Sequence, residues 1–90
     1  MHSFDEFRAA MLRRIATIVH VDVVHSADKI KELQVDDIYM TNILLSSECL
    51  LGWDMPEDQF NDLKANLLNK DLTVQEVLDT IWKKKEEATA

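Results

Sequence analysis

Two adjacent carboxylates, Asp36 and Asp37, are the side chains whose type and spacing best suit chemistry in this sequence. A pair of carboxylates can act as general acid and base, or can bind a metal ion. Here they directly precede a strongly apolar segment, and acidic residues in that place ordinarily cap a helix and interact favourably with its dipole. We therefore interpret the pair as the start of a helix.

No other group of residues has the spacing of a catalytic or metal site. Cys49 is the single cysteine, has no histidine near it in the sequence, and is expected to pack in an apolar helix as a small hydrophobe. His2, His20 and His25 show no recognised ligand spacing. Because no nucleophile, base and oxyanion donor come together, we predict that the protein is not an enzyme and binds no metal.

Hydrophobic periodicity predicts helices near both ends of the chain. Ser3 and Glu6 have the spacing of a capping box, and apolar residues recur at helical spacing to about residue 19. Thr73 and Glu76 form a second capping box before another apolar row. These two segments should be the first and last helices of the fold.

The middle of the chain predicts two further helices. Residues 38–51 are strongly apolar and are followed by Gly52, so this helix should be the centre of the core. Residues 57–68, after Pro56, have fewer apolar positions and predict a lesser helix. Residues 20–35 lose the periodicity, and a single strand there would have no partner for its backbone, so we expect a long structured loop.

Composition favours the same all-α fold class. The 90 residues include one glycine and one proline, whereas average usage would give roughly six and four or five. We expect one domain over residues 1–90, a bundle of three main helices plus one short helix with a long loop between the first and second helices.

The net charge of −7 argues against binding to nucleic acid or to an anionic membrane. With no long apolar run and no signal-peptide pattern, the expected location is the cytoplasm.

Two short motifs flank the second expected helix. Residues 36–38 read Asp-Asp-Ile, residues 55–56 read Met-Pro, and nineteen positions separate Asp37 from Pro56. With a closing segment at residues 72–81, this layout resembles the acyl and peptidyl carrier proteins. These are small acidic helical bundles in which Asp-Ser-Leu opens the second helix, Ile-Pro follows it, and the serine carries a phosphopantetheine arm.

The resemblance places Asp37 at the position of the modified serine. A carboxylate cannot form the phosphodiester that tethers the arm, so we expect Asp37 to be unmodified and the protein to carry no cofactor. Gln34, Ile38 and Tyr39 also depart from the family's pattern. The implied function is that of a non-catalytic docking module, acting in lipid, polyketide or peptide synthesis.

The resemblance also implies that a protein partner docks on the second helix. Among the acids that the family presents there, Glu48 is retained, whereas Asn42 and Cys49 stand at other matching positions. Near the helix start, Tyr39 and Met40 are expected to be exposed as an aromatic and apolar contact patch. The predicted partner contacts are Asp36, Asp37, Tyr39, Met40 and Glu48.

Two alternatives stay open. The first is a working acyl carrier whose phosphopantetheine is attached at a non-standard residue, for which Ser46 and Ser47 are the candidates within the second helix. The second is an unrelated helical interaction or chaperone module. A long first loop with a short third helix favours the carrier layout, whereas evenly sized antiparallel helices favour the unrelated module. The sequence does not indicate an oligomeric state.

Overall fold

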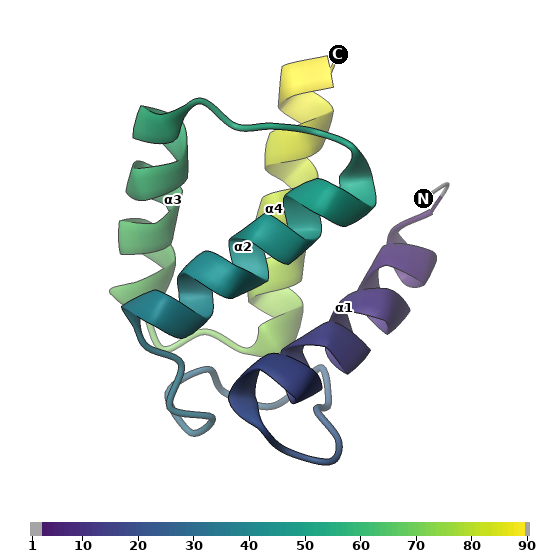
Figure 1. Cartoon of the computed structure of the whole chain (residues 1–90), viewed down its shortest axis with the longest axis vertical. Coiled ribbons are helices and arrows are strands. Elements are labelled where there is room, and N and C mark those ends of the chain that lie inside the picture. The colour runs from purple at the N-terminus through teal and green to yellow at the C-terminus, as the bar shows by residue number, and fades with distance from the viewer. Residues whose placement is uncertain (1–2, 90) are drawn as a thin grey trace.

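Four helices follow one another in the computed structural model, which describes residues 3–89 of the chain. They are α1 (Phe4–Val19), α2 (Asp37–Leu51), α3 (Glu57–Leu68) and α4 (Val74–Thr89) (Figure 1). No strand occurs within these described residues. The all-α prediction is confirmed, with a third helix of 12 residues against 15 or 16 in the others. His2 lies outside the described residues.

The starts of α1 and α2 are fixed by the side-chain caps that the sequence predicts. The Ser3 hydroxyl oxygen accepts a hydrogen bond from the Glu6 backbone N–H at 3.2 Å. The Asp36 carboxylate accepts one from the Tyr39 backbone N–H at 2.8 Å. At its other end α2 stops at Gly52, whose φ of 62° is a left-handed conformation that glycine adopts without steric cost.

The start of α4 is a reciprocal capping box. The Glu76 backbone N–H donates to the Thr73 hydroxyl oxygen at 3.1 Å, and the Thr73 backbone N–H donates to the Glu76 carboxylate at 3.0 Å. The hydrogen bonds from the Thr73 backbone and side chain hold the pKa of Glu76 below its ordinary value, with a smaller contribution from the positive charge of Lys29.

We expect the stabilisation from the ionised Glu76 carboxylate to be present at neutral pH and lost in acid. Because the pKa of this group is lower in the folded chain than in the unfolded one, its contribution is full above the unfolded pKa and disappears as the pH falls through the folded pKa. Glu76→Gln should therefore lower the Tm at pH 7 by a few degrees and change it less at pH 2. Thermal unfolding followed by circular dichroism at both pH values checks this, and an equal loss at both would contradict it.

The core lies where α2 meets the other three helices. Figure 1 shows α2 crossing in front of α4, with α1 on one side and α3 on the other, and α2 contacts all three. To pack against three neighbouring helices, α2 needs an apolar face toward each of them. This explains why the apolar residues of α2 cover more than one stripe. The completely buried apolar side chains include Phe7, Met11, Met40, Leu44, Leu78 and Ile81. The prediction that the second helix is the centre of the core is confirmed.

The long connection between α1 and α2, residues 20–36, is anchored to the start of α4. The Ile30 backbone N–H donates to the Leu72 carbonyl at 2.9 Å, and the Val74 N–H donates to the Asp28 carbonyl at 2.8 Å. Ile30 and Val24 are buried in the core. The connection is therefore a structured loop, as predicted, and its apolar residues contribute to the core without forming a strand.

Candidate functional site

The two aspartates at the start of α2 have different environments. Asp36 is the N-cap, and its carboxylate accepts the Tyr39 backbone N–H. Asp37 is the first residue of the helix, and its carboxylate forms an ion pair with the ammonium group of Lys64 on α3 at 3.1 Å. The cap interpretation is confirmed for Asp36, while the carboxylate of Asp37 connects two helices.

The Lys64 ammonium group is held between α2 and α3. Its side chain is 18% exposed, whereas the side chain of Asp37 is 70% exposed. The ammonium group also donates to the Thr41 hydroxyl oxygen at 3.4 Å, and that hydroxyl donates to the Asp37 carbonyl at 2.8 Å. An ion pair this exposed contributes about 0–1 kcal/mol to stability. Its effect on the site is to neutralise the charge of Lys64 and to fix the Asp37 carboxylate beside α3.

The expected exposure of Met40 is wrong. Its side chain is completely buried, because it lies on the same helical face as the buried residues Ile43 and Leu44. Tyr39 is half-buried, and its ring centroid lies 6.4 Å from that of His20 in an edge-to-face arrangement. Asp36 and Asp37 are exposed, and with part of Tyr39 they form the accessible end of α2.

The side chain of Glu48, a predicted partner contact, instead forms a hydrogen bond within the protein. It is 9% exposed, and its carboxylate accepts the backbone N–H of Met55 at 2.6 Å. The Trp53 N–H also donates to the Glu48 carbonyl, at 3.1 Å. The chain folds back after Gly52, and this brings residues 53–55 onto the last turn of α2. Glu48 thereby fixes the loop, and the prediction that it is available to a partner needs correction.

Cys49 is exposed, which contradicts the expectation that it packs in the core. It lies on the outward face of α2, one turn after Leu45, and therefore has no core to pack against.

The two serines in α2 differ in access. Ser47 is completely buried, and its hydroxyl donates to the Leu44 carbonyl at 2.7 Å. Ser46 is half-buried on the side of the helix. An arm on Ser47 would require this part of the core to open, so Ser46 is the more accessible of the two.

The outward face of α2 carries a feature that the sequence does not locate. Ile38 is 68% exposed and Leu45 is 51% exposed, and Leu45 follows Ile38 by seven positions, so both lie on one side of the helix. We call these two residues the α2 apolar row. The sequence indicates such a feature only through the excess of apolar residues in this helix. A helix of that kind must either pack against several neighbouring helices or carry an exposed apolar patch. The structure shows both.

A shallow groove of about 440 Å³ runs beside this row between α2 and α3. We call it the α2–α3 groove. Its apolar lining includes Leu45, Met55 and Phe60. Its charged lining includes Asp54, Glu57 and Lys64. Met55 and Phe60 are half-buried and pack against the core. The groove therefore combines an apolar floor with a charged rim.

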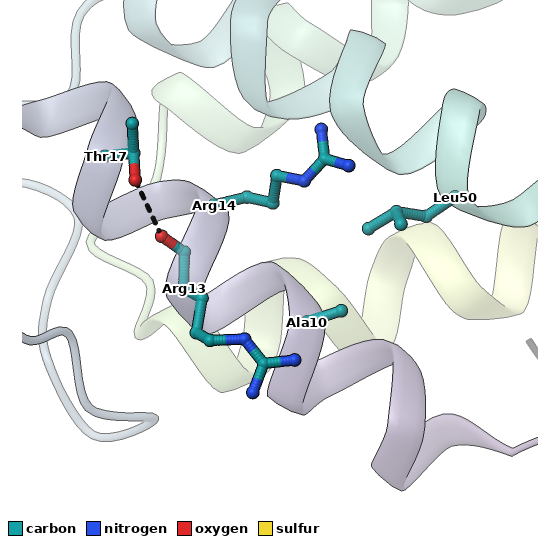
Figure 2. Close-up of a pocket in the computed structure, with 5 residues that line it drawn as sticks. All are labelled: Ala10, Arg13, Arg14, Thr17 and Leu50. Atoms are coloured by element: carbon teal, nitrogen blue, oxygen red, sulfur yellow. Dashed lines mark hydrogen bonds between the residues drawn. The ribbon is translucent and has the colours of Figure 1, made fainter.

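A second depression, of about 420 Å³, lies between α1 and α2 and contains two arginines. Figure 2 shows the side chains of Arg13 and Arg14 leaving α1 in different directions, with Arg14 pointing toward Leu50. The Thr17 hydroxyl, which also lines this surface, donates to the Arg13 carbonyl at 3.3 Å. Because the guanidinium groups diverge, they do not form a site for one anion.

Comparison of the chain with protein-family models, with curated proteins and with solved structures gives no match. Among residues 3–89, no helix is long and apolar enough to cross a membrane. The same residues hold no group of three or more histidine, cysteine or acidic side chains placed to bind a metal ion. What the geometry defines is a small all-α bundle with an acidic helix start and an exposed apolar row on α2.

Proposed function

We propose that the protein is an acyl-carrier-like docking module that carries no phosphopantetheine arm and catalyses no reaction. The observation that carries the proposal is the state of Asp37, the residue at the position of the carrier serine. Its carboxylate is not a group that can be joined to phosphopantetheine as a phosphodiester, and it is paired with Lys64 at 3.1 Å. The position that would hold the arm is thus used to connect α2 to α3.

The arrangement of the helices supports the carrier-like part of this proposal. The connection over residues 20–36 is long, and α3 is the shortest of the four helices within the described residues. An unrelated up-and-down bundle favours helices of even length with short connections. The uneven layout therefore agrees with carrier ancestry better than with coincidence.

The exposed surface of α2 supports the docking part. Asp36, Asp37 and Tyr39 remain proposed contacts at its start, and Ile38 and Leu45 extend the accessible apolar surface along it. Apolar side chains that are exposed in a row contribute to association when a partner covers them. We propose a protein partner of the lipid, polyketide or peptide synthesis machinery at this surface.

Incubation with coenzyme A and a promiscuous phosphopantetheinyl transferase tests the missing arm. The intact mass of the wild-type chain is expected to stay unchanged, while a serine-bearing carrier in a parallel reaction gains one phosphopantetheine. The matched variant Asp37→Ser restores the attachment residue, and we expect it to gain one phosphopantetheine. Intact-mass spectrometry measures both.

Each other result of this assay supports a different function. A gain on the wild-type chain, mapped to Ser46 or another residue by fragmentation, would contradict the proposal and support a working carrier with a non-standard attachment site. No gain on Asp37→Ser, with the control fully modified, would contradict the carrier-like layout. That result would support an unrelated helical interaction module.

A further inference from the structure

The outer side of α1 is positively charged, although the protein as a whole is acidic. Residues 7–21 contain no acidic side chain and three arginines, Arg8, Arg13 and Arg14. The guanidinium group of Arg8 pairs with a carboxylate one turn away, at 3.3 Å. Arg13 and Arg14 are both exposed, and within residues 3–89 no acidic side chain forms an ion pair with either of them. These two guanidinium groups are therefore available to the charges of another molecule.

The depression of about 420 Å³ between α1 and α2 lies beside these two arginines. Its apolar lining is Ala10 and the half-buried Leu50, and Thr17 completes it. Arg14 extends toward Leu50, while Arg13 extends in another direction (Figure 2). Because the guanidinium groups diverge, they suit two separate carboxylates that flank an apolar side chain. We call the five residues that line this depression the α1 basic surface.

Apolar side chains continue on the other side of Arg13. Arg13 also lines a smaller depression of about 150 Å³, together with Val23 and Asp22 of the loop after α1. Val23 is 62% exposed and Val21 is 40% exposed. Asp22 is the one acidic residue that lines either depression in the described chain. A partner that carries both apolar and acidic side chains is complementary to such a surface.

Charge also decides which class of molecule covers the α1 basic surface. A second copy of the chain would bring together two molecules that each carry −7, and these repel one another. A nucleic acid or an anionic membrane extends past α1 and meets the acidic remainder of the protein, which contains all 17 acidic side chains. A short acidic segment concentrates its charge at the arginines, and salt screens it from the more distant carboxylates.

We infer that the α1 basic surface binds an acidic amphipathic helix of another protein. An apolar side chain of that helix lies on Ala10 and Leu50, and its carboxylates pair with Arg13 and Arg14. A helix fits because acidic side chains can flank its apolar stripe on both sides. Leu50 follows Ile38 by twelve positions, which is about 18 Å along α2. The inference therefore goes beyond the docking proposed at the start of α2 and adds a second surface, of opposite charge.

A synthetic helix of alanine, leucine and glutamate, with leucine on one face only, is the probe that tests this inference. Titrated into isotope-labelled protein, it is expected to shift the backbone NMR signals of Ala10, Arg14 and Leu50 more than those of α3 and α4. A peptide with lysine in place of every glutamate should leave these signals unchanged. Largest shifts on any other face, or equal shifts with the lysine peptide, would overturn the inference.

Arginine variants give the quantitative test. Arg13→Gln with Arg14→Gln is expected to weaken binding of the glutamate peptide about tenfold and to remove most of its dependence on salt. Lys83→Gln with Lys84→Gln is the matched control, since it removes the same charge from two adjacent exposed positions of α4. Equal effects of the two double variants would overturn the inference, because they would show attraction to the net charge alone. Circular dichroism shows that each variant retains its fold.

Two further variants test the apolar contact and the local charge. Ala10→Gln fills the depression and is expected to weaken binding about fivefold. Ala9→Gln makes the same change at a neighbouring exposed position that does not line the depression, and should leave the affinity unchanged. Asp22→Asn removes the negative charge near Arg13 and is expected to strengthen binding about twofold. Equal affinities of the Ala10 and Ala9 variants would overturn the depression as the binding site.

The other occupants have tests of their own. Sedimentation of the wild-type chain over a range of concentrations is expected to show no association through α1. Vesicles of phosphatidylcholine and phosphatidylglycerol are expected not to bind the protein. Self-association or vesicle binding that the double variant of Arg13 and Arg14 abolishes would overturn the inference, and would assign the surface to a second copy or to a lipid surface. The mass assay of the Asp37 position is independent of these results.

Discussion

Replacing Met40 by alanine is expected to lower the free energy of unfolding by about 2–5 kcal/mol. Met40 is completely buried where α2 packs into the core, so the change removes apolar contacts and leaves a cavity. In a chain of 90 residues, this loss is a large part of the total stability. Urea unfolding followed by the helical circular dichroism signal measures it.

Two control variants separate packing from other causes. Met40→Leu keeps nearly the same volume and is expected to cost less than about 1.5 kcal/mol. Leu45→Ala removes a side chain of similar size from the exposed side of the same helix, and should change stability much less. If Met40→Ala were as stable as the wild type, the packing of α2 described above would be wrong.

This prediction also determines how Met40 variants should be interpreted in binding experiments. A loss of partner binding on Met40→Ala follows from loosening of α2 as a whole, since the side chain does not reach the surface. Leu45 and Ile38 are the positions on this helix where an apolar contact can be removed with little effect on the core.

The local features of the fold are those that the sequence predicts best. Thr73 and Glu76 form the expected reciprocal capping box, and the Ser3 hydroxyl oxygen caps α1 by accepting the Glu6 backbone N–H, because each interaction depends on residues three positions apart. Their geometry is fixed within one helical turn and does not depend on the rest of the fold. The long first loop and the shorter third helix are predicted for a similar reason, from the loss or weakness of local periodicity.

The orientation of α2 could not be predicted from its sequence. Met40 and Leu44 face the core while Ile38 and Leu45 face outward, although all four are apolar and of similar size. A helix that is apolar on most of its circumference gives no local signal for its inward face. The choice is made by packing against α1, α3 and α4, which is a property of the assembled fold.

The ion pair between Asp37 and Lys64 joins residues that lie 27 positions apart. The place of Asp37 at a helix start can be predicted from the sequence, but its ion-pair partner cannot. One signal was present, since Lys64 is the only basic side chain between residues 32 and 67, where there are 8 acidic ones. A single base in such a segment has many acidic neighbours available, but the fold decides which one pairs with it.

Replacing Glu48 by alanine is expected to lower the free energy of unfolding by about 1–3 kcal/mol. Its carboxylate accepts the Met55 backbone N–H at 2.6 Å and holds the loop between α2 and α3 against the end of α2. Alanine leaves that N–H without its acceptor, and charge-assisted hydrogen bonds are among the stronger ones in proteins. Urea unfolding measures the loss, and faster hydrogen exchange at the Met55 amide locates it.

Glu48→Gln distinguishes this structural role from that of a partner contact. Glutamine keeps an oxygen acceptor of the same reach and loses the charge, so it is expected to restore most of the stability and the slow exchange of the Met55 amide. A charge contact with a partner would respond in the opposite way, with stability unchanged and binding lost in both variants. If alanine and glutamine destabilise the chain equally, the hydrogen bond to Met55 is not what holds this loop, and the floor of the α2–α3 groove must be fixed by the packing of Met55 and Phe60 alone.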